Sequence, residues 1–135
     1  MKSIRERIDW RICMHVRSRH QMIKPLPTVG MFNFRCHENA TEYQRQHPEC
    51  GIVEVIYIDN GDPILHYINH NPETGEYLET TLGYRAEHLE YYKIRDIHPD
   101  DYRRTPAEFS RSLDSWLYQF TNWFERFFFR IDRVL

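Results

Sequence analysis

Residues 51–69, GIVEVIYIDNGDPILHYIN, decide the fold. Two runs rich in β-branched and aromatic residues, 51–58 and 63–69, flank the polar segment Asp-Asn-Gly-Asp. β-Branched and aromatic side chains favour extended backbone. Asn-Gly between two such runs is a strong hairpin signal, because both residues tolerate the positive φ angles of a tight turn. We therefore predict a β-hairpin in the middle of the chain.

Two more strands are predicted after the hairpin, at residues 77–84 and 91–97, with short polar turns between them. Periodic apolar residues predict helices at 4–16, 36–46 and 105–128, and the last of these is rich in aromatic side chains. Residues 24–30, KPLPTVG, are expected to be a linker because of their two prolines and glycine.

The predicted fold class is α+β. An antiparallel sheet of about four strands would be packed by the helix that begins at Cys36 and by a long aromatic C-terminal helix. The N-terminal helix would lie on the outside. A chain of 135 residues is expected to form one domain, 1–135.

The composition excludes several classes of protein. Three cysteines without a Cys-x-x-Cys pair argue against a disulfide framework and against a cysteine-only zinc site. The eight histidines are dispersed, so no metal or other cofactor is expected. The N-terminus is charged throughout, and no apolar run approaches the ~20 residues that span a bilayer. We expect a cytoplasmic protein with no membrane partner.

Charge is unevenly distributed along the chain. Residues 1–24 carry seven basic and two acidic side chains, whereas residues 36–101 carry fourteen acidic and four basic ones. A basic arm can bind nucleic acid. No nucleic-acid-binding pattern accompanies it, so pairing with the protein's own acidic body is the preferred interpretation.

Cys36 is the candidate nucleophile, because it stands where the second predicted helix begins. A helix N-terminus and a nearby histidine both stabilise a thiolate. His66, in the second strand of the hairpin, is the candidate general base and acid. Glu79, on the next strand, is placed to orient that histidine as a cross-strand neighbour. A buried structural role for the cysteine and the histidine is the competing interpretation.

Other residues near Cys36 and His66, and the other two cysteines, are weaker candidates for a catalytic role. Asn69 is expected to point away from His66, because it lies three positions along a strand. His37 is next to Cys36 on a helix and is not expected to serve as its base. Cys13 and Cys50 are expected to be structural.

The order helix cysteine, strand histidine and next-strand acid resembles the papain-like and transglutaminase-like cysteine superfamily. Within it, CHENA, PILHYIN and YLETTLG are similar to small phage and bacterial proteins with a CxxNA…H…D/E-x-T pattern. The resemblance covers residues 30–84. It implies that the single domain, 1–135, is of papain-like or transglutaminase-like type, and that a phage-encoded chain would be located in the host cytoplasm. It implies catalytic roles for Cys36, His66 and Glu79, with Asn33 as an oxyanion donor. Glu79 departs from the aspartate that is usual there.

These patterns together lead to the hypothesis of a small cysteine hydrolase or acyl transferase. It would act on a protein or peptide substrate by amide or thioester hydrolysis, deamidation or cross-linking. The alternative is a non-enzymatic phage accessory or inhibitory protein. That protein would bind a host protein through its acidic surface or its aromatic C-terminal helix, which could also form a homo-oligomer.

Overall fold

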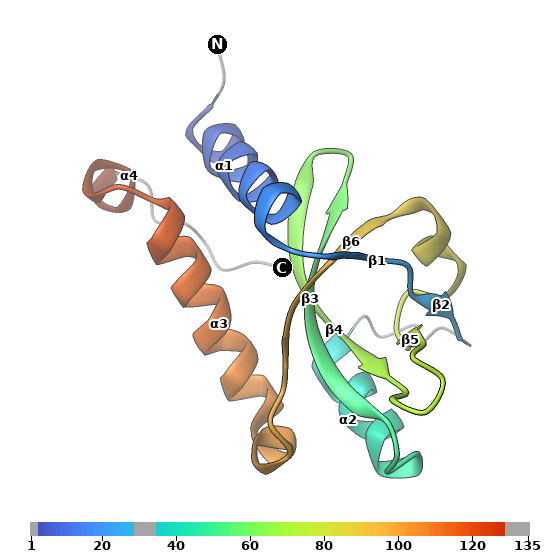
Figure 1. Cartoon of the computed structure of the whole chain (residues 1–135). Coiled ribbons are helices and arrows are strands. Elements are labelled where there is room, and N and C mark those ends of the chain that lie inside the picture. Colours follow the sequence, from blue (N-terminus) through green and yellow to red (C-terminus); the bar gives the residue numbers. More distant parts are fainter. Residues whose placement is uncertain (1–2, 29–34, 129–135) are drawn as a thin grey trace.

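A six-stranded sheet forms the centre of the protein, in the order β1-β6-β3-β4-β5-β2 (Figure 1). The computed structural model of the chain describes residues 3–28 and 35–128. The strands are β1 (Met22–Ile23), β2 (Leu26–Pro27), β3 (Gly51–Asp59), β4 (Asp62–His70), β5 (Tyr77–Glu79) and β6 (Glu90–Asp96). The helices are α1 (Ile4–Arg19), α2 (Cys36–Gln46), α3 (Thr105–Phe120) and α4 (Trp123–Phe128), with 3₁₀ helices η1 (Gly83–His88) and η2 (Pro99–Arg104). The α+β class is confirmed.

The prediction of about four strands was wrong, because the sheet has two more at its edges. Both come from the segment around the expected linker: β1 pairs antiparallel with β6, and β2 pairs parallel with β5. The sheet is therefore not purely antiparallel. Each added strand is two residues long, which is too short for periodicity to reveal. Pro27 has no N–H to donate, and an edge strand tolerates that.

The central hairpin formed as predicted. Strands β3 and β4 pair antiparallel from Gly51↔His70 to Asp59↔Asp62. The two turn residues, Asn60 and Gly61, have φ angles of 50° and 86°. Positive φ at both positions is the geometry that twists two strands into a tight hairpin.

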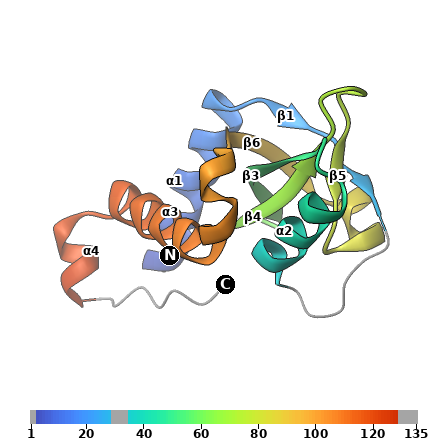
Figure 2. The ribbon, with the colours of Figure 1, turned by 90° about the horizontal axis from the view of Figure 1, so that it is seen from below.

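Helices α1 and α3 pack side by side on one face of the sheet (Figures 1 and 2). The N-terminal helix is therefore part of the core and not an outer element, which corrects the prediction. This core cluster contains Ile8, Ile12, Cys13, Val16, Ile56, Ile58, Leu65 and Tyr92, with Phe109, Leu113, Trp116 and Phe120 packed against it. Helix α2 covers the same face further along, where Cys36 and Ala40 meet Ile52 and Tyr67.

The opposite face of the sheet carries a second core cluster, which is covered by η1 and the segments around it. Its buried members are Ile23, Val53, Val55, Tyr57, Ile68, Ala86 and Tyr91. The third predicted strand is shorter than expected: β5 ends at Glu79, and the chain then turns into η1. This early end of β5 leaves the sheet open beside the centre of β4.

The aromatic C-terminal segment is two helices and not one long helix. Helix α3 ends at Phe120, and α4 begins at Trp123. Asn122 causes the break, because its amide oxygen accepts from the Glu125 N–H while the Glu125 carboxylate accepts from the Asn122 N–H. This reciprocal pairing starts a new helix. Among the described residues, no helix is long and apolar enough to cross a membrane.

Candidate active site

Cys36 is the first residue of α2, and its side chain is 7% exposed. It packs with Ala40 of the same helix against Ile52 and Tyr67 of the hairpin. The backbone of Tyr67 also helps to lower the pKa of the Cys36 thiol. The nucleophile predicted from sequence therefore lies at a helix N-terminus, beside the edge of β4.

His66 lies on the other face of the sheet from α2, in contact with the second core cluster. Its ring meets the Tyr57 ring edge-on, with the centroids 5.2 Å apart. Cys36 and His66 nevertheless lie close enough to shift each other's pKa, that of the thiol down and that of the imidazole up. The approach is possible because β5 pairs with β4 at Asn69 and His70 and does not flank β4 beside His66. At this edge of β4, the Cys36 side chain on one face of the sheet can approach the His66 side chain on the other face.

His66 and Glu79 form the hydrogen bond that the sequence predicted. The ring nitrogen Nε2 lies 2.9 Å from both carboxylate oxygens, and the two side chains are 4% and 0% exposed. Since a carboxylate only accepts, Nε2 carries the proton. The other ring nitrogen, Nδ1, is then the one available to Cys36. Continuing the β4–β5 register sets Glu79 beside Ile68, which is a diagonal position relative to His66.

Three further donors hold the Glu79 carboxylate. The backbone N–H groups of Thr81 and Leu82 donate to Oε1 at 3.0 and 3.1 Å. The Tyr91 hydroxyl donates to Oε2 at 2.7 Å. On the backbone, the Glu79 carbonyl accepts from the N–H and the hydroxyl of Thr28, at 3.1 and 2.9 Å. A carboxylate held by this many donors is both ionised and fixed in place.

These contacts shift the pKa values of the three groups in a consistent way. Burial raises the pKa of the Cys36 thiol, but hydrogen bonds with His37 and His66 outweigh it, and the pKa falls to about 6. Burial lowers the pKa of His66, but the Glu79 charge and the bond to Cys36 raise it to about 10. Burial raises the pKa of Glu79, and its bonds to His66 and Tyr91 bring it below the usual value. The resting site therefore holds thiolate, imidazolium and carboxylate in a row.

Cys36 and His37 shift each other's pKa, that of the thiol down and that of the imidazole up, although His37 was not expected to serve as the base for Cys36. The expectation assumed that neighbours on a helix point apart. In the first turn of α2 the His37 ring is instead held against the Phe109 ring of α3, with centroids 5.8 Å apart and planes 26° apart. Only a tertiary contact could reveal this arrangement, since Phe109 is 72 positions away.

Two further residues were considered from the sequence for a role in the site, Asn33 and Asn69. Asn33, the expected oxyanion donor, lies outside the described residues. Asn69 points away from His66 as expected: its amide donates to the carbonyls of Ala40 and Gly51, at 2.9 and 3.2 Å. Asn39, in the CHENA motif, was expected only to cap the helix or favour its dipole, but it makes a tertiary contact. Its amide donates to the Thr81 hydroxyl at 3.0 Å, which links α2 to the turn after Glu79.

The other two cysteines are buried, at 2% exposed for Cys13 and 3% for Cys50. Burial raises the pKa of both thiols above the ordinary value of 9.0. All three cysteines are therefore buried, but the pKa of Cys36 is lowered, whereas the pKa values of Cys13 and Cys50 are raised. Among the described residues, no three His, Cys, Asp or Glu side chains come together as a group of metal ligands.

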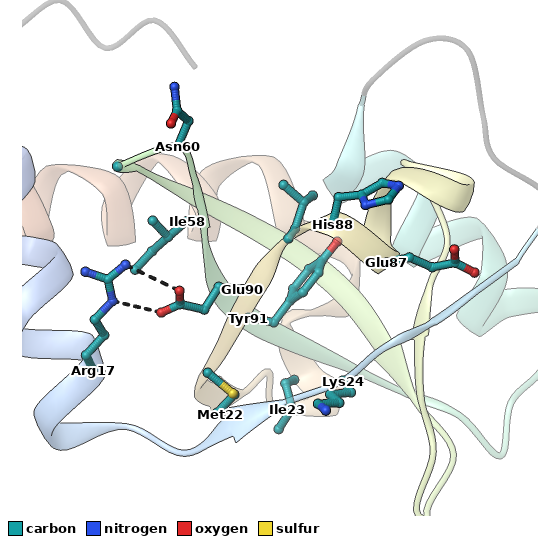
Figure 3. Close-up of a pocket in the computed structure, with 12 residues that line it drawn as sticks. Arg17, Met22, Ile23, Lys24, Ile58, Asn60, Glu87, His88, Glu90 and Tyr91 are labelled. Carbon is teal, nitrogen blue, oxygen red and sulfur yellow. Dashed lines mark hydrogen bonds and ion pairs between the residues drawn. The ribbon is translucent and has the colours of Figure 1, made fainter.

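Figure 3 shows a pocket of about 430 Å³ between α1, β1, η1 and the β3–β4 turn. Arg17 and Glu90 pair across it, with a shortest N–O distance of 2.8 Å. Cys36 and His66 are not among the described residues that line this pocket. Tyr91 belongs to both places: its ring lines the pocket, and its hydroxyl holds Glu79.

Comparison of the chain with protein-family models, with curated proteins and with solved structures found no match. The function is therefore inferred from the geometry of the site and from the order of its residues along the chain.

Proposed function

We propose that this protein is a cysteine-dependent acyl-transfer enzyme, a hydrolase or transferase that acts on an amide or a thioester. The observation that carries the proposal is the buried pair of His66 and Glu79, 2.9 Å apart, beside Cys36 at a helix N-terminus, where His66 lowers the pKa of the thiol. The three residues lie on a helix and two strands, in the order that the papain-like and transglutaminase-like resemblance implies.

Because the resting site already holds the Cys36 thiolate beside the His66 imidazolium, the chemistry begins with the thiolate. The thiolate attacks the carbonyl carbon of the substrate, a C–S bond forms, and the carbonyl oxygen becomes an oxyanion. When that intermediate collapses, the bond to the leaving group breaks and an imidazolium beside Sγ supplies the proton that the leaving atom needs. Water, or an amine in a transferase, then attacks the thioester and releases the thiolate.

Glu79 keeps the His66 ring in one tautomer and orientation and stabilises its positive charge. The 2.9 Å contacts indicate that a glutamate reaches the ring here. Its longer side chain is matched by donors from Thr81, Leu82 and Tyr91, which hold the carboxylate from the far side. The departure from aspartate is thus compatible with an orienting role.

The test is alkylation of the folded protein by iodoacetamide at pH 7, with the modified cysteines identified by peptide mass spectrometry. Cys13 and Cys50 are internal controls, because they are buried as deeply as Cys36. At pH 7 a thiol with a pKa of about 6 is mostly thiolate, whereas one with a pKa of 9.0 or more is about 1% thiolate. We expect Cys36 to react at least about tenfold faster. Equal, slow reaction of all three cysteines would falsify the proposal.

Exposed aromatic side chains favour a second candidate, a binding protein without enzymatic activity. Tyr118 is 67% exposed and Trp123 is 73% exposed, both near the junction of α3 and α4. Replacement of these two residues by serine would then abolish the biological effect, while Cys36→Ala would preserve it. The enzyme hypothesis predicts the reverse.

A further inference from the structure

The thiol of Cys36 is almost closed off from solvent, although an acyl-transfer reaction requires it to meet a substrate. Only 7% of Cys36 is exposed. It belongs to a buried cluster whose other members are Ala40, Ile52, Tyr67 and Ile97. A nucleophile must come within about 3–3.5 Å of the carbonyl carbon that it attacks. Part of the structure must therefore move before a substrate can reach Sγ.

Two aromatic side chains from one continuous stretch of chain cover this cluster. Tyr102 of η2 and Phe109 of α3 pack against it. The Phe109 ring meets the Tyr67 ring edge-on, with the centroids 5.3 Å apart. Figure 2 shows the N-terminal end of α3 beside α2 and the rest of that helix beside α1. The stretch from Pro99 to Ser112 therefore lies over the cluster that contains the nucleophile.

The contacts that hold this stretch in place are largely polar. The fully buried residues of α3 are Thr105 and Glu108, and η2, all of whose residues are described, has none. The Thr105 hydroxyl lies 2.9 Å from the Thr41 hydroxyl of α2. The Ser112 hydroxyl donates to the Glu54 carboxylate of β3 at 2.7 Å. Opening exchanges such hydrogen bonds for hydrogen bonds to water, so the net cost of each exchange is small.

The C-terminal half of α3 is attached mainly by apolar contacts. Leu113, Trp116 and Phe120 pack against the core cluster between α1 and the sheet. The Arg11 guanidinium of α1 also donates to the Phe120 carbonyl at 2.9 Å. Phe109 packs against this cluster as well as against the one that contains the thiol, so it joins the two halves of the helix. Since regions with few buried apolar contacts open locally, residues 99–112 can open while the rest of the core stays closed.

We propose that η2 and the first half of α3, residues 99–112, are a lid over the active site, and that local opening of this lid admits the acyl donor to Cys36. This inference rests on the proposed acyl-transfer function, because it supplies the access that the reaction requires. Phe109 is the main apolar contact that the lid must release.

A buried hydroxyl beneath the lid favours opening. The Tyr67 hydroxyl has no hydrogen-bond partner among the described residues. A buried polar group without a partner costs free energy. When the lid opens, this hydroxyl can bond water or a polar group of the substrate, and the cost is removed. The closed state is therefore less stable than its apolar contacts alone would make it.

The test follows alkylation of the full-length protein by iodoacetamide from about pH 5 to 10, with the rate at each cysteine read by peptide mass spectrometry. Phe109→Ala removes the aromatic contact of the lid. Trp116→Ala is the matched control, because Trp116 is also half-buried and lies seven positions further along, on the same face of α3. When a lid opens and closes quickly, the rate of alkylation is proportional to the open fraction.

In Phe109→Ala, the rate at Cys36 on the alkaline plateau should rise at least about tenfold, because the open fraction increases. The pH of half-maximal rate should not change, since His66 still stabilises the thiolate. Trp116→Ala should leave the Cys36 rate unchanged. Cys13, in the core cluster under α1, reports unfolding of the whole domain and should stay slow in Phe109→Ala.

Three results overturn the lid: an unchanged Cys36 rate in Phe109→Ala, an equal increase at Cys13, or the same increase in Trp116→Ala. If Phe109→Ala does not fold, Ser112→Ala is tested instead, because it removes the hydrogen bond between the lid and Glu54. We then expect an increase of at least about threefold at Cys36, and no increase overturns the proposal.

Failure of the underlying function gives a different result. In that case the Cys36 rate rises in Phe109→Ala, but the pH of half-maximal rate lies near 9.0, the ordinary pKa of a thiol, in the wild type and the variant. If the lid alone fails, that pH is about 6 and the rate is the same in both proteins.

Discussion

Asn39 and Thr81 lie 42 positions apart in the chain, and a buried hydrogen bond of 3.0 Å joins their side chains. Asn39 is on the helix that begins at Cys36, and Thr81 is on the turn that follows Glu79. The Thr81 N–H also donates to the Glu79 carboxylate. This one contact therefore couples the position of the nucleophile to the position of the acid.

Thr81→Val removes the hydroxyl that accepts the hydrogen bond from the Asn39 amide and keeps the size of the side chain. It leaves the buried Asn39 amide without this acceptor, so we expect the free energy of unfolding to fall by about 1–3 kcal/mol. Alkylation of Cys36 at pH 7 should slow as well, because the carboxylate loses its fixed position. Urea denaturation and alkylation measure the two effects. Gln46→Ala, at the exposed end of the same helix, should change neither. A stable Thr81→Val protein with normal Cys36 reactivity would contradict the coupling.

Glu79→Gln removes the charge and keeps the shape. Without the carboxylate, the pKa of His66 should fall from about 10 toward its ordinary value. The Cys36 thiolate should then lose stabilisation, and its alkylation at pH 7 should slow. Breaking a buried ion pair typically costs ~3–5 kcal/mol of stability, so the midpoint of unfolding is recorded for each variant. NMR titration of the His66 ring measures its pKa, and an unchanged value would rule out the role assigned to Glu79.

Glu79→Asp tests the chain length at the same position. The shorter side chain must give up either the His66 contact or the donors at Thr81 and Leu82, because both now lie at hydrogen-bonding distance from the longer one. We expect Cys36 reactivity between that of the wild type and that of Glu79→Gln. Reactivity above the wild type would show that glutamate is an impaired substitute for aspartate here.

Tyr91→Phe and Tyr67→Phe form a matched pair. Both side chains are buried, at 1% and 0% exposed, but the Tyr91 hydroxyl donates to Glu79 and the Tyr67 hydroxyl has no partner among the described residues. Loss of a hydrogen bond to a charged group should make Tyr91→Phe less stable by about 1.5–3 kcal/mol. Tyr67→Phe should be neutral or slightly stabilising, because it removes an unpaired buried polar group. Thermal unfolding compares them, and equal losses would be inconsistent with this network.

Stability should form a plateau between about pH 6.5 and 9. His66 has a raised pKa, so its contribution is complete below the unfolded value of 6.5 and is lost as pH rises to about 10. Cys36 has a lowered pKa, so its contribution is complete above 9.0 and is lost as pH falls to about 6. Between 6.5 and 9 the two slopes cancel, since the folded and unfolded states bind the same number of protons at the pair.

Outside this pH range, a different ionisable group controls the pH dependence of stability on the alkaline side and on the acid side. Above pH 9 the free energy of unfolding should fall by at most about 1.4 kcal/mol per pH unit as His66 loses its proton. At acid pH the lowered pKa of Glu79 means that stability decreases as pH falls below its unfolded value of 4.5. Denaturation curves from pH 4 to 10 test this shape. In His66→Gln, the decrease above pH 9 should be absent.

Local sequence determined the secondary structure wherever the signal spans a whole element. The β-branched runs on either side of Asn60 and Gly61 specified the central hairpin. The turn requires positive φ angles at both positions, and Asn and Gly adopt these readily. The range predicted for the second helix, 36–46, is the one observed for α2. Strands β1 and β2 were missed, because a two-residue strand is defined by its hydrogen-bonding partner and not by its own periodicity.

In the candidate site, too, some contacts could be predicted from the sequence and others depend on tertiary packing. The contact between His66 and Glu79 followed from sequence, because alternation along two adjacent strands puts both side chains on one face. The order of the motifs also predicted His66 as the base for Cys36, but alternation along a strand does not by itself bring a helix residue to that histidine. The approach requires β5 to end at Glu79, so that the edge of β4 stays open, and the place of the His37 ring requires α3 to bring Phe109 against it. These relationships join segments far apart in the chain, and only the packing of the helices on the sheet decides them.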